Sequence, residues 1–246
     1  MTSRLLALTA GIALLAPGLL PRRSDDRAGL PPLMLWAWER PLDLRGLPAH
    51  TGVAFLAQTL TVSATTHVVA PRRQPLHVDP ETPLVAVTRI EAPGAVPGAG
   101  GDVGGIADAI ARTAELPSVR GVQVDFDAGT SQRAMYRHLL HQVRRALKPG
   151  TPLSITALAS WCMQDNWLDD LPVDEAVPML FRMGPSQLAL RSQAADAMRA
   201  RSCQGTLGIS LDEPTNLSRP PARLYVFNPG PWTASSLAAA ARQVKR

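Results

Sequence analysis

Short apolar segments recur along the chain at intervals that suit alternating strands and helices. Most are nearly continuous apolar runs, as is usual for strands that are buried on both faces. Eight strand candidates can be marked in this way: 33–38, 52–60, 84–91, 119–127, 153–159, 176–181, 207–211 and 223–228. Helical patterns lie at about 106–115, 132–147 and 186–199, and an alanine-rich amphipathic helix closes the chain.

This count and alternation predict an α/β fold, an irregular (β/α)8 TIM-type barrel. The irregularity comes from connecting helices that are short or missing. Residues 61–83 hold four prolines, which forbid a long helix, so we expect a hairpin or an extended excursion there. A doubly wound open sheet is the alternative architecture. No repeat or second domain is visible, so residues 33–246 are expected to form one barrel-like domain.

The segment 119–127 differs from the other strand candidates because polar residues alternate with apolar ones. Gln123, Asp125 and Asp127 therefore share one face. A surface strand would have no need of two acids at its C-terminal end, and a long amphipathic helix follows. We therefore expect a buried strand that delivers two carboxylates to its C-terminal tip, where barrels of this kind build their sites.

The first 32 residues are expected to be a signal or anchor segment and a linker. Arg4 precedes the apolar run 5–20, which predicts export to the periplasm or anchoring in the inner membrane. The run is short for a membrane span, and the arginines at 22, 23 and 27 that follow it oppose translocation. A cleaved signal, an uncleaved anchor and a wrongly assigned start all remain open.

Composition adds few constraints. The 246 residues are 46% hydrophobic and carry a formal net charge of +5. The basic residues occur as scattered pairs with no aromatic interleaving, whereas a nucleic-acid-binding protein usually concentrates such charge on one face. We therefore expect no nucleic-acid partner. The oligomeric state is not indicated.

The chain has two cysteines, Cys162 and Cys203. Cys162 follows a strand candidate and Cys203 precedes one, so a regular barrel would place them at opposite ends. That separation exceeds the roughly 7 Å that a disulfide can bridge. Two unpaired, mostly buried thiols are therefore expected.

The residues that end the strand candidates are unusually rich in acids, arginines and tryptophans. Paired carboxylates can divide into a proton donor and a base or nucleophile, and tryptophans suit the apolar faces of sugar rings. The expected catalytic residues are Asp127, Asp125, Glu39, Asp212 and Glu213. The expected substrate-binding residues are Trp38, Gln58, Arg89, Glu91, Trp161, Arg182, Asn228 and Trp232.

Within this set, Asp125 and Asp127 should act together. Successive residues on one face climb the strand, so Asp125 should lie deeper and Asp127 nearer to solvent. Two acids so close need a cation, and Arg89 on the neighbouring strand is the expected one. Asp125 should then stay charged while Asp127 is the more easily protonated.

Other motifs are weak. His138 and His141 lie three residues apart on a helix without a third ligand nearby in sequence, and a solvated helix face explains them better than zinc. The glycine-rich stretch 98–103 lacks the third glycine of a dinucleotide fingerprint. We expect neither a metal nor a cofactor.

The segment Arg120-Gly121-Val122-Gln123-Val124-Asp125-Phe126-Asp127 resembles the fourth-strand motif D-G-x-D-x-D-x-E of the chitinase-like (family 18) glycoside hydrolases. The positions of Gly121 and Asp125 match, and Asp127 stands where that family has its catalytic glutamate. Trp232 also fits that family's tryptophan after the eighth strand. The resemblance implies a TIM barrel that acts on a carbohydrate.

A closer resemblance runs through most of residues 33–233. The stretches that carry it are 36–41, 124–128, 153–162, 177–184 and 210–214, which include V-D-F-D-A and S-L-D-E-P. They look like an uncharacterised bacterial family, known only as a domain of unknown function. That resemblance implies motif boundaries and a fold, and it brings no established activity.

Two functions are therefore open. The first is a glycoside-hydrolase-like enzyme with Asp127 as proton donor, Asp125 as its electrostatic partner, and Glu39, Asp212 or Glu213 as the second carboxylate. The second is a cell-envelope barrel that binds a carbohydrate or a protein without turnover. Carboxylates that are all neutralised by Arg89 and Arg182 would favour the second.

Overall fold

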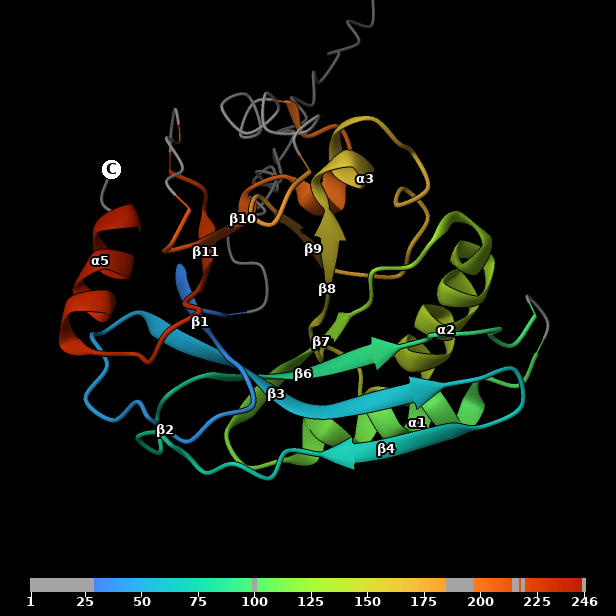
Figure 1. The fold of residues 1–246 in the computed structure, drawn as a ribbon, viewed down its shortest axis with the longest axis horizontal. Coiled ribbons are helices and arrows are strands. Elements are labelled where there is room, and N and C mark those ends of the chain that lie inside the picture. Colours follow the sequence, from blue (N-terminus) through green and yellow to red (C-terminus); the bar gives the residue numbers. More distant parts are fainter. Residues whose placement is uncertain (1–28, 99–100, 185–196, 214–216, 218–219, 245–246) are drawn as a thin grey trace, which may run out of the picture.

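The computed structural model describes residues 29–98, 101–184, 197–213, 217 and 220–244. Its main feature is a ring of eight parallel strands (Figure 1). The ring strands are β1 (Leu33–Ala37), β3 (Thr51–Val62), β6 (Leu84–Glu91), β7 (Val119–Asp125), β8 (Leu153–Leu158), β9 (Glu175–Met179), β10 (Thr206–Ser210) and β11 (Arg223–Phe227). Because β1 pairs with both β3 and β11, the ring closes and the fold is an irregular TIM-type barrel.

Each of the eight strand candidates from the sequence coincides with a barrel strand to within two residues at either end. The predicted barrel is confirmed, and the closed ring excludes the alternative of an open sheet. The excursion expected at 61–83 is also present. It forms β4 (His67–Pro71), which pairs antiparallel with β3, and a two-stranded ribbon of β2 (Leu42–Asp43) and β5 (Leu76–His77).

In the described part of the chain, the helices around the barrel are few and mostly short. They are α1 (Gly104–Arg112), α2 (Arg133–Ala146), α3 (Ala159–Met163) and α5 (Ala234–Val244), with 3-10 turns η1 (Thr113–Glu115), η2 (Thr130–Gln132) and η4 (Arg201–Cys203). In Figure 1, α1 and α2 lie on one side of the molecule and α5 on the other. Most of the helix expected at 186–199 lies outside the described residues.

No helix in the described part of the chain is both long and apolar enough to cross a membrane. The apolar run expected to serve as a signal or anchor, residues 5–20, lies outside that part.

The half of the barrel interior at the N-terminal ends of the strands holds a buried polar network. Glu175 forms an ion pair with Arg223, and its carboxylate also accepts a hydrogen bond from the hydroxyl of Tyr225 over 2.7 Å. The hydroxyl of Ser154 links Glu175 to Gln123, with contacts of 3.3 and 3.0 Å. Buried polar groups are tolerated when they are all hydrogen-bonded in this way.

The top of this network supports a tryptophan. Gln123 accepts a hydrogen bond of 2.9 Å from the indole nitrogen of Trp36, and the indole ring packs against Tyr225. The ring also lies against Gly208, where a Cβ would sit only 2.7 Å from it. Because Gly208 has no side chain, it leaves the space in the barrel that Trp36 fills.

The prediction of two unpaired cysteines is wrong. Cys162 and Cys203 form a disulfide with a Cα–Cα separation of 5.9 Å. A full-length helix after β8 would have kept the two cysteines apart. Instead, α3 is a short turn of five residues, and it places Cys162 in the core between the barrel and the outer segments. The chain returning to β10 runs beside it, since the amide of Arg199 donates to the carbonyl oxygen of Cys162 over 2.8 Å.

We expect the double variant Cys162→Ala/Cys203→Ala to unfold with a free energy about 3 kcal/mol lower than the parent. The bridge closes a loop with a sequence separation of 41, which restricts the unfolded chain. Urea unfolding with and without reductant measures this. Reductant should destabilise the parent and leave the variant unchanged, and a parent that is insensitive to reductant would contradict the disulfide.

Candidate functional site

A cavity of about 550 Å³ opens at the C-terminal ends of the barrel strands. It is the place where barrels of this class build their sites. Six strands or the loops directly after them supply its walls: β1, β6, β7, β8, β9 and β11. The lining residues are Trp36, Trp38, Arg89, Asp125, Asp127, Thr156, Leu158, Ala159, Met179, Phe181, Arg182, Met183, Gly184, Phe227 and Pro229.

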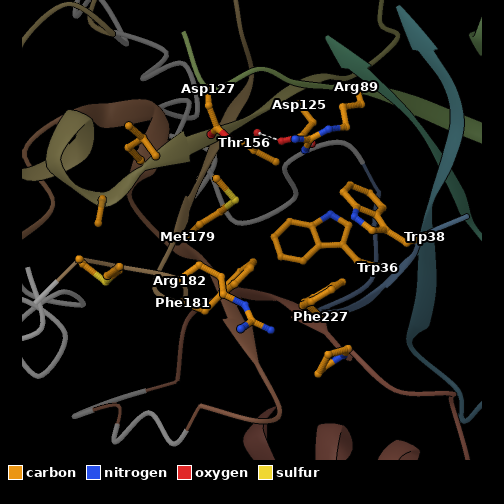
Figure 2. A pocket seen from close by; sticks show the side chains of 15 residues that line it. Trp36, Trp38, Arg89, Asp125, Asp127, Thr156, Met179, Phe181, Arg182 and Phe227 are labelled. Atoms are coloured by element: carbon orange, nitrogen blue, oxygen red, sulfur yellow. Dashed lines mark hydrogen bonds and ion pairs between the residues drawn. The ribbon is translucent and has the colours of Figure 1, made fainter. Parts of the chain in front are cut away.

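The charged side of the cavity is built around Asp125, which is only 3% exposed. One of its carboxylate oxygens accepts a hydrogen bond of 2.8 Å from the Arg89 guanidinium, and the other accepts one of 2.7 Å from the hydroxyl of Thr156. Figure 2 shows Arg89, Asp125 and Thr156 close together beside Asp127. With both oxygens engaged, Asp125 is held in one orientation at the floor of the cavity.

Asp127 stands two residues further along, at the exposed rim. No hydrogen bond or salt bridge joins its carboxyl group to any residue that the structure describes. Surrounding protein atoms remove part of its water and raise its pKa, and the negative charge of Asp125 raises the pKa further, while Arg89 opposes both. The expected arrangement, with Asp125 deep, Asp127 outside and Arg89 as the cation, is therefore confirmed.

The opposite side of the cavity is aromatic. Phe181 and Phe227 stack with ring centroids 5.6 Å apart, and Trp36 meets the edge of Phe181 at 5.9 Å. Trp38 packs edge-on against Phe227 at 6.3 Å. In Figure 2 these rings and Met179 face the side that carries the two acids. A ligand would therefore touch apolar ring faces on one side and carboxyl groups on the other.

Arg182, at the mouth of the cavity, has an unusual backbone. Its φ of 55° lies in the left-handed region, which residues with a side chain rarely adopt. Glu213 stabilises this conformation by accepting a hydrogen bond of 3.0 Å from the Arg182 amide. The guanidinium lies 3.1 Å from Asp212 and 3.7 Å from Glu213. Such local strain is common at functional sites, and here it directs a cation to the rim.

Five of the expected site residues line the cavity: Trp38, Arg89, Asp125, Asp127 and Arg182. Three more support them without lining it. Glu91 lies 3.5 Å from the Arg89 guanidinium, and Asp212 and Glu213 pair with Arg182.

The other five expected residues are not brought to the cavity. Gln58 is buried on the outer side of β3, where it donates to Thr88 and to a carbonyl of α1. Trp161 packs against Trp167 in the outer core. Glu39 accepts hydrogen bonds from the backbone amides of Arg73 and Gln74, and it thereby anchors the segment 61–83. Asn228 donates to the carbonyl oxygen of Pro231 in the loop after β11, and the indole nitrogen of Trp232 donates to the carbonyl oxygen of Trp36 on β1.

Several lining residues were not expected from the sequence, because the expectation rested on polar groups at strand ends. Trp36, Thr156, Met179 and Phe227 lie on the inward faces of their strands, and Phe181 lines the cavity just after β9. The sequence signal for these residues was the strand period of two, by which residues two positions apart share a face. Trp36 precedes Trp38 by two positions, and Phe181 follows Met179 by two, so each pair shares a face.

We expect Arg89→Met to lower the free energy of unfolding by about 1–2 kcal/mol. Removing a partner from a buried pair costs more, but Arg89 itself is 39% exposed, which reduces the effect. The pKa of Asp127 should rise, because Arg89 opposes its protonation. Urea unfolding and titration of the carboxyl group by NMR measure both quantities.

The control is Arg45→Met, which removes an exposed ion pair with Asp43 and should leave the stability essentially unchanged. An Arg89→Met variant that matched the parent in both stability and titration would show that the coupled site does not exist.

The fold and the cavity define this chain as an irregular TIM barrel with an acidic and aromatic pocket at the C-terminal ends of its strands. No family model and no curated protein matches it. Among solved structures it is similar to the Bacillus cereus spore cortex-lytic enzyme SleL, with 17% identity and a TM-score of 0.45. That match covers 86% of this chain and 57% of the other.

The chain therefore spans little more than half of SleL, and the lytic activity in that name is SleL's own. The resemblance to an uncharacterised bacterial family stays an expectation from the sequence.

Proposed function

We propose that this protein acts on a carbohydrate, with the cavity as the sugar-binding site and Asp127 as the proton donor that cleaves a glycosidic bond. The observation that carries the proposal is the carboxyl group of Asp127. It lies in a ligand-sized cavity, opposite aromatic rings, with a raised pKa and no ion pair among the described residues. A carboxyl group in such a place stays protonated to a higher pH than usual, which suits a proton donor.

The aromatic side suits a sugar ring. Trp38 and Phe227 line the cavity and are partly exposed, and one face of a pyranose carries mainly C–H groups. A sugar lying on these rings would turn its oxygen atoms toward the opposite side, where Asp127 and Asp125 stand. Aromatic contact would then supply affinity, and the polar side would set orientation.

In the proposed reaction, the acid form of Asp127 gives its proton to the glycosidic oxygen while the bond to the anomeric carbon breaks. The ionised Asp125, held by Arg89 and Thr156, lies below and stabilises the positive charge that develops on the sugar. A water molecule then bonds to the anomeric carbon and gives a proton to the Asp127 carboxylate, which restores the acid, while the alcohol released from the glycosidic bond departs. The second carboxylate expected from Glu39, Asp212 or Glu213 has no place in this account, because Glu39 holds backbone amides and the other two hold Arg182.

A second function, carbohydrate binding without turnover, is favoured by the contacts that the other acids make within the protein. Apart from Asp127, each of the acids expected to be catalytic is engaged by an arginine or by backbone amides. A protein of this kind would use Asp127 as a hydrogen-bonding group alone. The two functions share the cavity and differ in whether a bond is broken.

Incubation with a panel of polysaccharides separates the two, with release of reducing ends and binding both measured. Asp127→Asn is the test variant, and Glu39→Gln is the matched control because Glu39 lies on the same rim outside the cavity. We expect the parent and the control to cleave at least one polysaccharide and the test variant to be at least a hundredfold slower. Equal rates for parent and test variant would remove Asp127 from the mechanism, and binding without cleavage would establish the second function.

We also propose that the protein is exported, to the periplasm or to an inner-membrane anchor. Disulfides persist in oxidising compartments, and the Cys162–Cys203 bridge supports this location. The apolar run after Arg4 points in the same direction. Cell fractionation that recovered the protein from the cytoplasm with both thiols reduced would contradict it.

A further inference from the structure

The two arginines that line the cavity are already engaged by carboxylates. Arg89 donates to Asp125 over 2.8 Å and also lies 3.5 Å from Glu91. Arg182 lies 3.1 Å from Asp212 and 3.7 Å from Glu213. Each guanidinium thus has two acidic neighbours. A carboxylate or phosphate on a ligand would have to compete with these groups for its partner.

The next cation on this rim is also engaged. Arg40 follows β1 and donates to the carbonyl oxygen of Pro229 over 2.9 Å, and Pro229 itself lines the cavity. That contact holds the loop after β11 against the loop after β1. Like the other two, this guanidinium is committed to the protein.

Asp127 differs from these charged groups. It is the lining residue whose charge has no ion-pair partner in the described part of the chain. Among the described residues, the charge that the cavity offers to a ligand is therefore negative, although the chain as a whole has a formal net charge of +5. A negative local charge attracts a positively charged ligand.

The aromatic wall favours the same sign of ligand charge. The faces of Trp36, Trp38, Phe181 and Phe227 carry negative electrostatic potential and attract cations, and tryptophan does so most strongly. A carboxylate opposite aromatic faces is an arrangement that holds an ammonium group, with a charge-assisted hydrogen bond on one side and cation–π contact on the other. Neutral sugars would use the rings alone.

We infer that the cavity selects a carbohydrate with free, protonated amino groups, that is, a de-N-acetylated amino sugar, and that Asp127 is the residue that sets this preference. The inference rests on the proposed function, since it names the substrate class of the same cavity. N-acetylation would remove the charge and enlarge the group that faces Asp127. A uronic acid would bring a second negative charge beside the carboxylates.

Asp127 can hold an ammonium group only as a carboxylate and can donate a proton only as an acid. The charged groups that act on it are Asp125 on β7 and Arg89 on β6, and its own charge helps to raise the pKa of the buried Tyr136 on α2. Binding of an amino sugar should therefore strengthen as the pH rises through the pKa of Asp127, while kcat falls. A group that only shaped the cavity would not divide KM from kcat in this way.

The test uses three β-1,4-linked hexasaccharides that differ at C2 alone, those of glucosamine, N-acetylglucosamine and glucose. Calorimetric titration of the full chain measures binding at low and at high salt, with Asp127→Asn as the test variant and Glu39→Gln as the control. We expect the glucosamine hexamer to bind at least tenfold more tightly than the other two. This advantage should weaken with salt, disappear in Asp127→Asn and persist in Glu39→Gln. Thermal unfolding checks that both variants are folded.

Three results bear on the inference in different ways. Equal or tighter binding of the N-acetylated or the neutral hexamer would overturn the amino-sugar preference and leave the proposed function standing. A preference for glucosamine that survived in Asp127→Asn would overturn the role of Asp127. If none of the three was bound, the amino-sugar preference would fail, and cleavage in the polysaccharide panel would decide the proposed function separately.

Discussion

Replacing Arg223 by methionine is expected to lower the free energy of unfolding by about 3–5 kcal/mol, the largest loss from any single change considered for this chain. Arg223 and Glu175 are almost fully buried inside the barrel, with side-chain exposures of 8% and 5%. Methionine has a similar length but no charge, so Glu175 would keep a buried negative charge without its ion-pair partner. The guanidinium also donates to the carbonyl oxygens of Leu30 and Pro31, and those contacts would be lost as well.

A double variant separates the charge from the packing. Adding Glu175→Gln to Arg223→Met removes the orphaned charge and keeps an acceptor for the hydroxyl of Tyr225. We expect the double variant to recover at least half of the lost stability, because an unpaired buried charge costs more than a neutral amide. Urea unfolding measures all three proteins. If the double variant were no more stable than Arg223→Met, the loss would come from shape and not from charge.

The second large effect is on turnover and follows from the protonation state of Asp127. Burial and the charge of Asp125 raise the pKa of Asp127 above its ordinary value of 3.8. A proton donor is active in its acid form, so kcat/KM should be high at low pH and fall as the pH rises through this raised pKa. In Asp127→Asn, kcat should drop by about 10²–10⁴-fold and this limb of the profile should vanish. A limb that persisted in the variant would assign it to another group.

The raised pKa of Asp127 also makes the stability of the fold depend on pH. A carboxyl group whose pKa is raised on folding stabilises the fold when protonated, and this contribution is lost as the pH rises through the folded pKa. At neutral pH, Asp127 therefore weakens the fold slightly. Asp127→Asn should be at least as stable as the parent there, with the difference disappearing in acid. Thermal unfolding at several pH values measures this, and a variant that was less stable at neutral pH would show that Asp127 has a structural role.

The barrel could be predicted from the sequence because its strands are short and buried. Buried parallel strands appear as nearly continuous apolar runs, and eight such runs separated by helical patterns have few ways to pack. The excursion at 61–83 was also visible, since proline excludes the helix that a regular barrel would place there. The alternation around Asp125 then indicated which strand carries acids into the interior.

Two features could not be reached in this way. The disulfide depends on how far α3 turns before the chain returns beside it, a tertiary detail that no local pattern encodes. The cavity walls depend on which side of each strand faces inward. Gln58 illustrates this, because the pairing of β3 with β6 is irregular between Leu56 and Gln58, and the side chain of Gln58 lies beneath α1. One irregular position was enough to place an expected ligand contact outside the barrel.

The most direct test of the account is a crystal structure of the Asp127→Asn variant with a bound oligosaccharide, the substitution being chosen to stop cleavage. We expect a sugar ring to lie against Trp38 and Phe227, with a glycosidic oxygen within hydrogen-bonding reach of the side chain at position 127. Arg89 and Asp125 should keep their contact of 2.8 Å beneath it. An oligosaccharide bound elsewhere on the barrel, with the cavity left to solvent, would contradict the assignment of this site.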